Sequence, residues 1–192
     1  MRATLRRAGR DVRRGLTGSS RRRAEERLRR HLLTFLDGRP VGVLALTAAV
    51  DGEPDLIPLG ETLRGRGWQL ALPVVADDTR MWFARWEPGT TLAEDRYGIP
   101  TPVGAARVAE SRLDVVLVPC VAVDRSGNRL GFGAGFYDRA LVGLRREALT
   151  VATVFSEQVV EEVPAGDWDV RMDAVVTDAG IVRNGAAGSG RA

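Results

Sequence analysis

The chain has 192 residues, the length of one ordinary domain, and its hydrophobic (44%) and charged (28%) fractions are typical of a globular protein. Its single cysteine excludes an internal disulfide and any metal site built from several cysteines. The formal net charge of +3 is mild, no apolar run reaches the roughly 18 residues of a membrane helix, and the N-terminus lacks the apolar segment of a signal peptide. We therefore expect a cytoplasmic protein without a membrane partner.

Two helices are predicted near the N-terminus, over residues 2–14 and from about residue 21 to residue 36, with a break and a capping serine at 17–20. Arginines are concentrated in this region, and all 28 basic residues of the chain are arginines. Such a cluster attracts phosphate, although a solvated helix face explains most of these arginines equally well. The cluster has no interleaved aromatic residues, which argues against the alternative of a nucleic-acid-binding module.

Short apolar runs alternate with helical segments along the rest of the chain. The runs typical of buried strands lie at 41–46, 68–72, 81–86, 114–118, 149–155 and 175–177. A short helix is predicted to begin near Pro54 and another over 136–146, while residues 87–107 are predicted to form an ordered loop. This alternation predicts an α/β fold, with a mostly parallel central sheet and helices on both faces.

The segment with the clearest chemistry follows the strand at 114–118. A glycine-rich turn at 131–135 opens the helix that begins at Phe136, so its backbone can approach a phosphate closely and present free N–H groups to it. Arg129 can add a charge-assisted contact, and Asp138 is a hard oxygen ligand suited to Mg²⁺. The glycine spacing differs from the Rossmann and P-loop spacings, so a purely structural turn stays open at this point.

Residues 128–139 resemble the signature of the 5-formyltetrahydrofolate cyclo-ligase family, which typically has Arg-Leu-Gly, a glycine-rich stretch, an aromatic residue and Tyr-Asp. Further matches follow in the family's order at 2–6, 52–55, 72–73, 97–102, 163–169 and 172–177. The resemblance spans roughly residues 2–180. We place a single cyclo-ligase domain at 1–183 and predict a disordered tail at 184–192.

This resemblance implies an enzyme that uses ATP and Mg²⁺ to convert 5-formyltetrahydrofolate to 5,10-methenyltetrahydrofolate, as a monomer that binds no nucleic acid. Carried over by position, the ATP contacts would be Arg2, Arg6, Arg129, Leu130, Gly131, Phe132, Gly133, Ala134, Gly135, Phe136 and Tyr137. Arg129 and Tyr137 would also be the catalytic residues. The Mg²⁺ ligands would be Asp138 and Asp173, and the folate would contact Glu53 and Tyr97.

The chain departs from the family pattern at a few of these positions. Arg2 replaces the usual lysine, which keeps the charge but changes the geometry. Ala134 stands where other members often have glycine or a basic residue, and Phe136 lacks the hydroxyl of a common tyrosine. A paralogue of the same fold that binds ATP but acts on another substrate therefore stays an alternative.

Several candidate residues also have plain structural explanations. Asp173 could cap a segment or pair with an arginine, and Glu53 could be a charge at a helix N-terminus. His31 and Cys120 are expected to be a packing residue and an inert buried thiol. Trp82 and Trp86 lie an even number of positions apart and so share one face of a strand, which favours strand-face packing over contact with a ligand.

Overall fold

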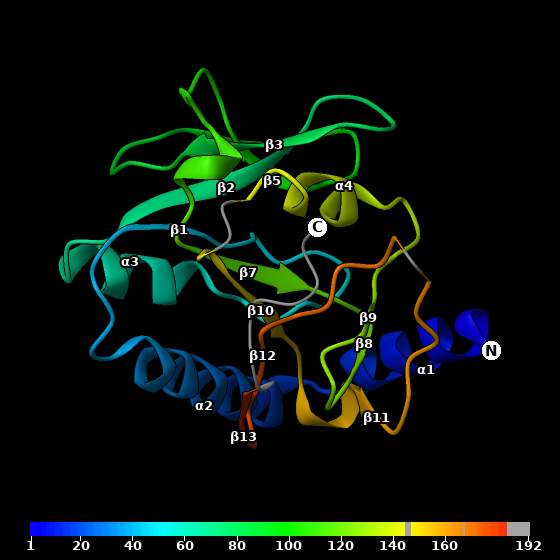
Figure 1. The fold of residues 1–192 in the computed structure, drawn as a ribbon. Coiled ribbons are helices and arrows are strands. Elements are labelled where there is room, and N and C mark those ends of the chain that lie inside the picture. The colour runs from blue at the N-terminus through cyan, green and yellow to red at the C-terminus, as the bar shows by residue number, and fades with distance from the viewer. Residues whose placement is uncertain (145–146, 167, 184–192) are drawn as a thin grey trace.

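An eight-stranded sheet forms the centre of the computed structural model, which describes residues 1–144, 147–166 and 168–183 (Figure 1). In sheet order its strands are β13 (Gly180–Arg183), β12 (Ala174–Thr177), β10 (Leu149–Thr153), β7 (Val115–Pro119), β1 (Val43–Ala45), β2 (Gln69–Val75), β3 (Met81–Arg85) and β6 (Arg107–Val108). The strands from β12 to β2 run parallel, and antiparallel strands close both edges. The predicted mostly parallel sheet is thus confirmed.

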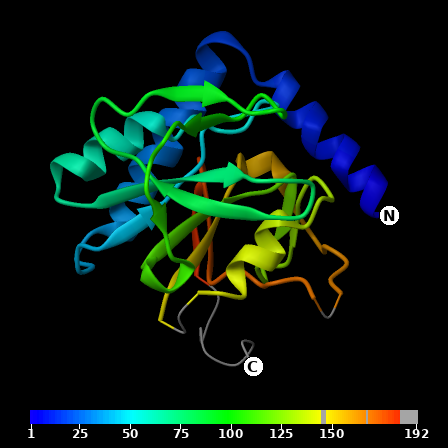
Figure 2. The same cartoon turned by 90° about the horizontal axis from the view of Figure 1, so that it is seen from above.

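Helices cover both faces of this sheet, as predicted. The two helices α2 (Gly18–Leu36) and α3 (Ile57–Gly65) pack on one face, and the short α4 (Phe136–Leu141) packs on the other (Figure 2). Successive side chains of β7 alternate between the two cores: Val115 and Leu117 join the α2–α3 core, whereas Val116 and Val118 join the α4 core. A strand buried on both faces explains the continuous apolar run of residues 114–118.

The first helix, α1 (Arg2–Gly15), lies away from the main sheet. It packs beside a small sheet in the order β11 (Val159–Val160), β8 (Ala122–Asp124) and β9 (Arg129–Leu130), and beside the 3₁₀ turn η2 (Ser156–Gln158) (Figure 1). Gly9 permits a very close approach, because a Cβ atom there would lie 2.1 Å from the Val121 carbonyl oxygen. Only Gly9 and Arg13 of this helix are buried.

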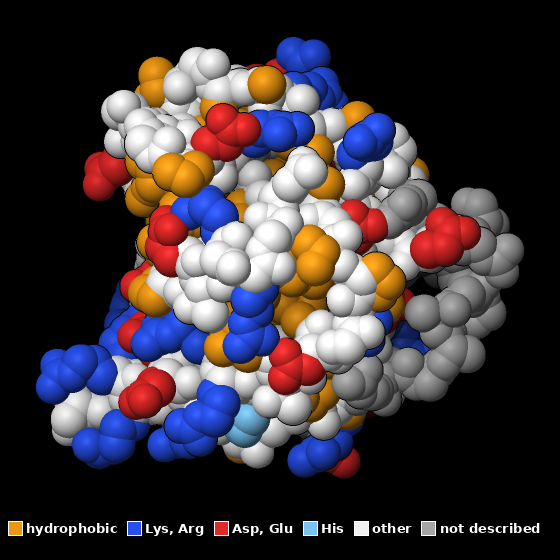
Figure 3. Space-filling model, turned by 90° about the vertical axis from the view of Figure 1, so that its left-hand side faces the viewer, with side chains coloured by type: hydrophobic (Ala, Val, Ile, Leu, Met, Phe, Trp, Pro, Cys, Tyr) orange, Lys and Arg blue, Asp and Glu red, His pale blue; other side chains and the backbone are white. Residues whose placement is uncertain are grey.

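The exposed arginines of α2 confirm the solvated helix face that the sequence predicts for much of the basic cluster. Arginines gather over the lower part of the face drawn in Figure 3, where α2 lies. The exposed ones on α2 are Arg22, Arg23, Arg27 and Arg30. Within the described part of the chain, no helix is both long enough and apolar enough to cross a membrane.

Several predicted boundaries were wrong for local reasons. The third helix begins at Ile57, so Pro58 occupies its first turn and Pro54 precedes it. The break before α2 has no capping serine: the N-cap is Thr17, and the Ser20 hydroxyl donates to the Thr17 carbonyl oxygen at 2.6 Å. The helix predicted over 136–146 ends at Leu141.

Several short elements were also missed by the sequence prediction. The predicted loop 87–107 contains the hairpin β4 (Leu92–Glu94) and β5 (Pro100–Pro102), and the 3₁₀ turn η1 (Glu110–Arg112) follows it. The strand at 175–177 is not the final one, because the chain reverses and pairs as β13 along β12. The tail predicted at 184–192 lies outside the described residues, so the division at residue 183 stays a prediction.

We expect Gly9→Ala to weaken the docking of α1, because the new methyl group must displace the Val121 carbonyl oxygen. Overpacking of this kind costs about 1–3 kcal/mol, which urea unfolding would detect as a lower midpoint. Gly15→Ala is the matched control, since no atom lies within 4 Å of a Cβ placed there. Equal midpoints for the two variants would contradict the close approach.

Candidate active site

The glycine turn, residues 131–135, connects β9 to α4 and is open to solvent. Phe132, Gly133 and Ala134 are exposed. Gly133 and Gly135 have φ values of 112° and 68°, which favour glycine because a side chain would be strained there. The turn therefore has an accessible backbone that side chains do not cover.

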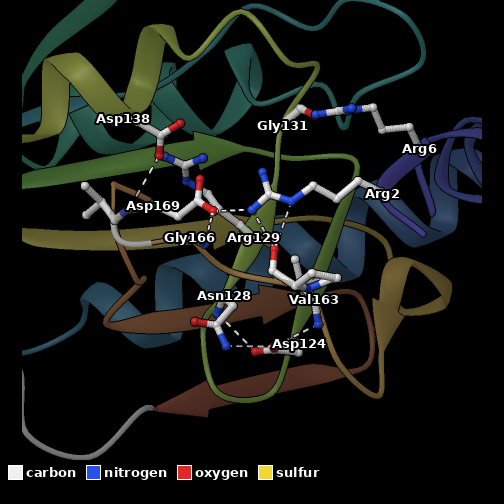
Figure 4. Close-up of polar contacts among 12 residues, drawn as sticks. Arg2, Arg6, Asp124, Asn128, Arg129, Gly131, Asp138, Val163, Gly166 and Asp169 are labelled. Atoms are coloured by element: carbon white, nitrogen blue, oxygen red, sulfur yellow. Dashed lines mark hydrogen bonds and ion pairs between the residues drawn. The ribbon is translucent and has the colours of Figure 1, made fainter. Parts of the chain in front are cut away.

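Arginines of α1 reach this turn and the segment beside it (Figure 4). The Arg6 Nε donates to the Gly131 carbonyl oxygen at 2.9 Å, and a Cβ on Gly133 would lie 3.3 Å from the Arg6 Nη2. Arg2 lies farther along: its guanidinium donates to the Pro164 carbonyl oxygen at 2.6 and 3.0 Å and pairs closely with Asp169. Of the two predicted α1 contacts, the structure thus brings Arg6 to the turn and Arg2 to the C-terminal segment.

Arg129 and Asp138 form an ion pair at the base of the turn (Figure 4). The Arg129 Nη2 lies 2.5 Å from the Asp138 Oδ1, which also accepts from the Val170 amide at 3.4 Å. Arg129 is only 5% exposed, and its Nε has no hydrogen-bond partner among the residues that the structure describes. A buried donor without a partner is costly, so this atom is a good candidate to contact a bound anion.

Leu130, another predicted ATP contact, does not line the glycine turn. Leu130 is buried with Leu5, Ala122 and Val163, and its carbonyl oxygen accepts from the Val121 amide at 2.7 Å. Its side chain therefore packs beneath the turn instead of lining it.

Two further predicted residues, Tyr137 and Glu53, lie in the interior beside the turn. The Tyr137 hydroxyl is buried and has no hydrogen-bond partner in the described part of the chain. Burial raises the pKa of Tyr137, and the nearby Glu53 charge raises it further. Glu53 is 2% exposed, and burial raises its pKa to about 7, although the Arg13 guanidinium 3.8 Å away acts in the opposite direction.

Tyr97 adjoins the turn from the β4–β5 hairpin. Its ring meets the Phe136 ring edge-on, with centroids 6.1 Å apart, and its hydroxyl donates to Asp78 at 3.3 Å. Tyr97 is 48% exposed. The structure therefore brings a predicted folate contact beside a predicted nucleotide contact, with the Arg96 guanidinium 4.9 Å from the centroid of the half-exposed Tyr97 ring.

The two predicted metal ligands occupy different surroundings. Asp138 pairs with Arg129, whereas the Asp173 Oδ2 accepts from the amide and hydroxyl of Thr150 at 2.8 and 2.9 Å, where β10 and β12 begin. Among residues 1–144, 147–166 and 168–183, no group of three or more His, Cys, Asp or Glu is placed to hold a metal ion. The magnesium site stays a prediction.

Sequence comparison then identifies the chain. The sequence profile of the 5-formyltetrahydrofolate cyclo-ligase family matches residues 1–178. The chain belongs to the 5-formyltetrahydrofolate cyclo-ligase family. It is similar to proteins of that name from Escherichia coli (35% identity, covering 88% of this chain and 95% of the relative) and Haemophilus influenzae (32%, covering 84% and 89%).

Solved structures agree with the family fold. The chain is similar to 5,10-methenyltetrahydrofolate synthetase of Aquifex aeolicus, with a TM-score of 0.81 and 32% identity, covering 96% of this chain and 93% of the other. The Mycoplasma pneumoniae synthetase, at 24% identity and a TM-score of 0.78 over 92% and 98% of the two chains, supports the fold alone. This cyclo-ligase is thus an ATP-dependent ligase, and the predicted family and enzyme class are confirmed.

The sequence prediction missed two arginines that hold this cyclo-ligase site together. Arg139 of α4 donates to the carbonyl oxygens of Thr79 and Ala134 at 2.6 and 2.7 Å, so it ties the β2–β3 loop to the glycine turn. Arg13 is buried against Glu53. Arg2, Arg6, Gly9 and Arg13 follow one another at steps of four, three and four residues, which indicates one shared helix face.

We expect Glu53→Gln to change how stability depends on pH. The folded protein binds the Glu53 proton more tightly than the unfolded chain, whose pKa is near 4.5, so the Glu53 contribution falls as pH rises from 4.5 to about 7. Glutamine removes this ionisation. The free energy of unfolding of the variant, relative to the wild type, should therefore rise by up to about 3 kcal/mol across that interval.

Urea titrations at several pH values would measure this difference. Glu157→Gln, at an exposed position in η2, is the control and should show no such trend. A difference that is constant with pH would show that Glu53 ionises normally in the folded protein.

Proposed function

We propose that this cyclo-ligase converts 5-formyltetrahydrofolate to 5,10-methenyltetrahydrofolate and that ATP leaves as ADP and phosphate. The formyl amide is a poor electrophile. Transfer of the γ-phosphoryl group to its oxygen forms an iminium phosphate, which N10 then attacks so that the ring closes and phosphate departs. Such a reaction requires mainly that the protein positions the reactants and neutralises phosphate charge.

The observation that carries this proposal is the open glycine turn between two arginines. Arg6 lies over the turn and Arg129 lies at its base with a buried, unpartnered Nε. Main-chain amides of residues 131–135 together with these guanidinium groups suit a triphosphate, because fixed donors in a partly enclosed site stabilise the charge that moves during transfer. The residues present therefore fit ATP.

Magnesium is the proposed partner of the triphosphate, with Asp138 and Asp173 as its ligands. Mg²⁺ held there would neutralise phosphate charge during the transfer. The fit is partial. The Asp138 carboxylate supplies hard oxygen atoms beside the turn, but it pairs with Arg129, while Asp173 hydrogen-bonds to Thr150.

Folate binding is proposed at Glu53 and Tyr97. A carboxylate is suited to accept hydrogen bonds from the amino and N–H edge of the pterin, and the half-exposed Tyr97 ring offers a surface for stacking. Tyr137 has a proposed catalytic role, since its buried hydroxyl is a free donor between the two regions. We further propose a cytoplasmic monomer that binds neither membrane nor nucleic acid.

We expect Arg129→Ala and Asp138→Ala each to abolish formation of methenyltetrahydrofolate, a loss of at least about 10²–10³-fold, because the first removes a cation beside the phosphates and the second removes a proposed Mg²⁺ ligand. Absorbance during incubation with ATP, Mg²⁺ and 5-formyltetrahydrofolate measures the product. Circular dichroism should show that both variants are folded. Arg125→Ala is the control, since this arginine is exposed in the same segment. Full activity in both site variants would refute the site assignment.

Tyr97→Ala should raise the KM for 5-formyltetrahydrofolate about threefold to tenfold, because an aromatic contact contributes about 0.5–1.5 kcal/mol. Tyr97→Phe keeps the ring and removes only the hydrogen bond to Asp78, so its KM should stay close to that of the wild type. If the two variants have the same KM, the ring does not contact the folate.

A further inference from the structure

Arg13 is a buried charge that the proposed reaction does not use. It is 1% exposed, in a helix whose other arginines are partly or fully exposed. A buried guanidinium is costly unless hydrogen bonds and an opposite charge compensate it. The protein therefore retains this residue at a cost to stability that a leucine or methionine would not incur.

The contacts of Arg13 join three separate parts of the active site. Its Nη2 donates to the Cys120 carbonyl oxygen at 2.7 Å, directly after β7, and lies 3.8 Å from the Glu53 Oε1. Its Nη1 donates to the Asp51 carbonyl oxygen at 3.5 Å. The same guanidinium lies 5.3 Å from the ring centroid of Phe132 in the glycine turn.

Glu53 depends on this one cation. In the described part of the chain, Arg13 is its only ion-pair partner, and the one hydrogen bond to its carboxylate comes from the Val50 amide at 3.3 Å. The other ionisable groups around it are Asp51 in its own loop, Cys120 after β7, Tyr137 on α4 and Arg21 on α2, whose Nη2 donates to the Glu53 main-chain carbonyl oxygen at 2.6 Å.

Among the described residues, these neighbours supply no second cation to the Glu53 carboxylate, because Arg21 meets the Glu53 main chain and pairs with Glu25 at 3.0 Å. Burial raises the pKa of Cys120 to about 12 and raises that of Tyr137 as well, so both stay neutral near pH 7. Asp51 adds only negative charge, which disfavours the Glu53 carboxylate. Arg13 is thus the group that favours the ionised form.

We propose that Arg13 is a positioning residue that holds the Glu53 carboxylate ionised and directed at the N–H edge of the folate, without itself touching the substrate. This inference rests on the proposed function, because it takes Glu53 to be the folate contact. Loss of Arg13 would then weaken folate binding most at low pH, where Glu53 takes up a proton and can no longer accept two hydrogen bonds.

Arg10 offers a matched control on the same helix. Its guanidinium also lies over the Phe132 ring, 5.5 Å from the centroid, and it pairs with Asp51 at 3.2 Å. It has no ion pair with Glu53 among the described residues. A comparison of Arg13→Met with Arg10→Met therefore separates the contact with Glu53 from the loss of an arginine above the glycine turn.

The experiment measures kcat/KM for 5-formyltetrahydrofolate and KM for ATP between about pH 6 and pH 9. In the wild type, kcat/KM should fall as pH drops through about 7, as Glu53 becomes protonated. In Arg13→Met this limb should move up by about one pH unit, which is about a fivefold loss at pH 7 that approaches tenfold at lower pH and recovers as pH rises. The ATP KM should match that of Arg10→Met within about twofold. Superimposed pH profiles for the two variants would overturn the proposal.

Two further measurements keep the test decisive. If Arg13→Met does not fold, the pair Arg13→Lys and Arg10→Lys replaces it. Lysine cannot reach Cys120, Asp51 and Glu53 in one geometry, so the folate KM should rise at least about threefold in Arg13→Lys alone, and an equal KM in both would overturn the proposal. Calorimetric titration with 5-formyltetrahydrofolate gives the same comparison without turnover. Wild-type protein that binds the folate but makes no product would refute the proposed reaction and leave the Arg13 comparison intact.

Discussion

The close packing of α1 on β8 is the constraint on which the rest of the site depends. With no side chain at Gly9, the helix lies against the Val121 backbone, and the residues before and after Gly9 on the same face then reach the site. Arg6 reaches the glycine turn, and Arg13 enters the interior beside Glu53. A helix displaced by the width of one methyl group would lose both contacts together, because both arginines project from one rigid element.

Burial of the charged and polar groups inside the site costs folding free energy. Arg13, Glu53 and Arg129 are all buried, and the Arg129 Nε and the Tyr137 hydroxyl have no partner among the described residues. Buried ion pairs seldom add stability over an apolar core of the same volume, and unpartnered donors reduce it. Such features persist where a ligand supplies the missing partners, which suits a site that binds a triphosphate and a polar heterocycle.

The sequence predicted what local chemistry determines and missed what distant contacts determine. The alternation of strands with helices predicted the sheet, and the motif at 128–139 predicted the family. Both signals depend only on residues that are near one another in the sequence. The burial of Arg13 depends on Cys120 and Glu53, which lie far away in the chain. The contact between the Tyr97 and Phe136 rings likewise depends on the β4–β5 hairpin. The sequence prediction assigned this hairpin to a loop because residues 87–107 are rich in glycine and proline. Asp173 is a further example, because its hydrogen bond with the Thr150 amide joins two strands that are distant in the sequence.

The contact of Arg2 with Pro164 and Asp169 sets the order in which the enzyme can be completed. Pro164 and Asp169 lie 162 and 167 residues after Arg2 in the sequence, so the Arg2 guanidinium can form these contacts only after both residues have been synthesised. During synthesis α1 can form its helix early, but the segment on which Arg2 docks is not available until it has left the ribosome. A nascent chain that ends before Asp169 thus carries a basic helix whose first residue is not yet docked, and the site beside that helix is still incomplete.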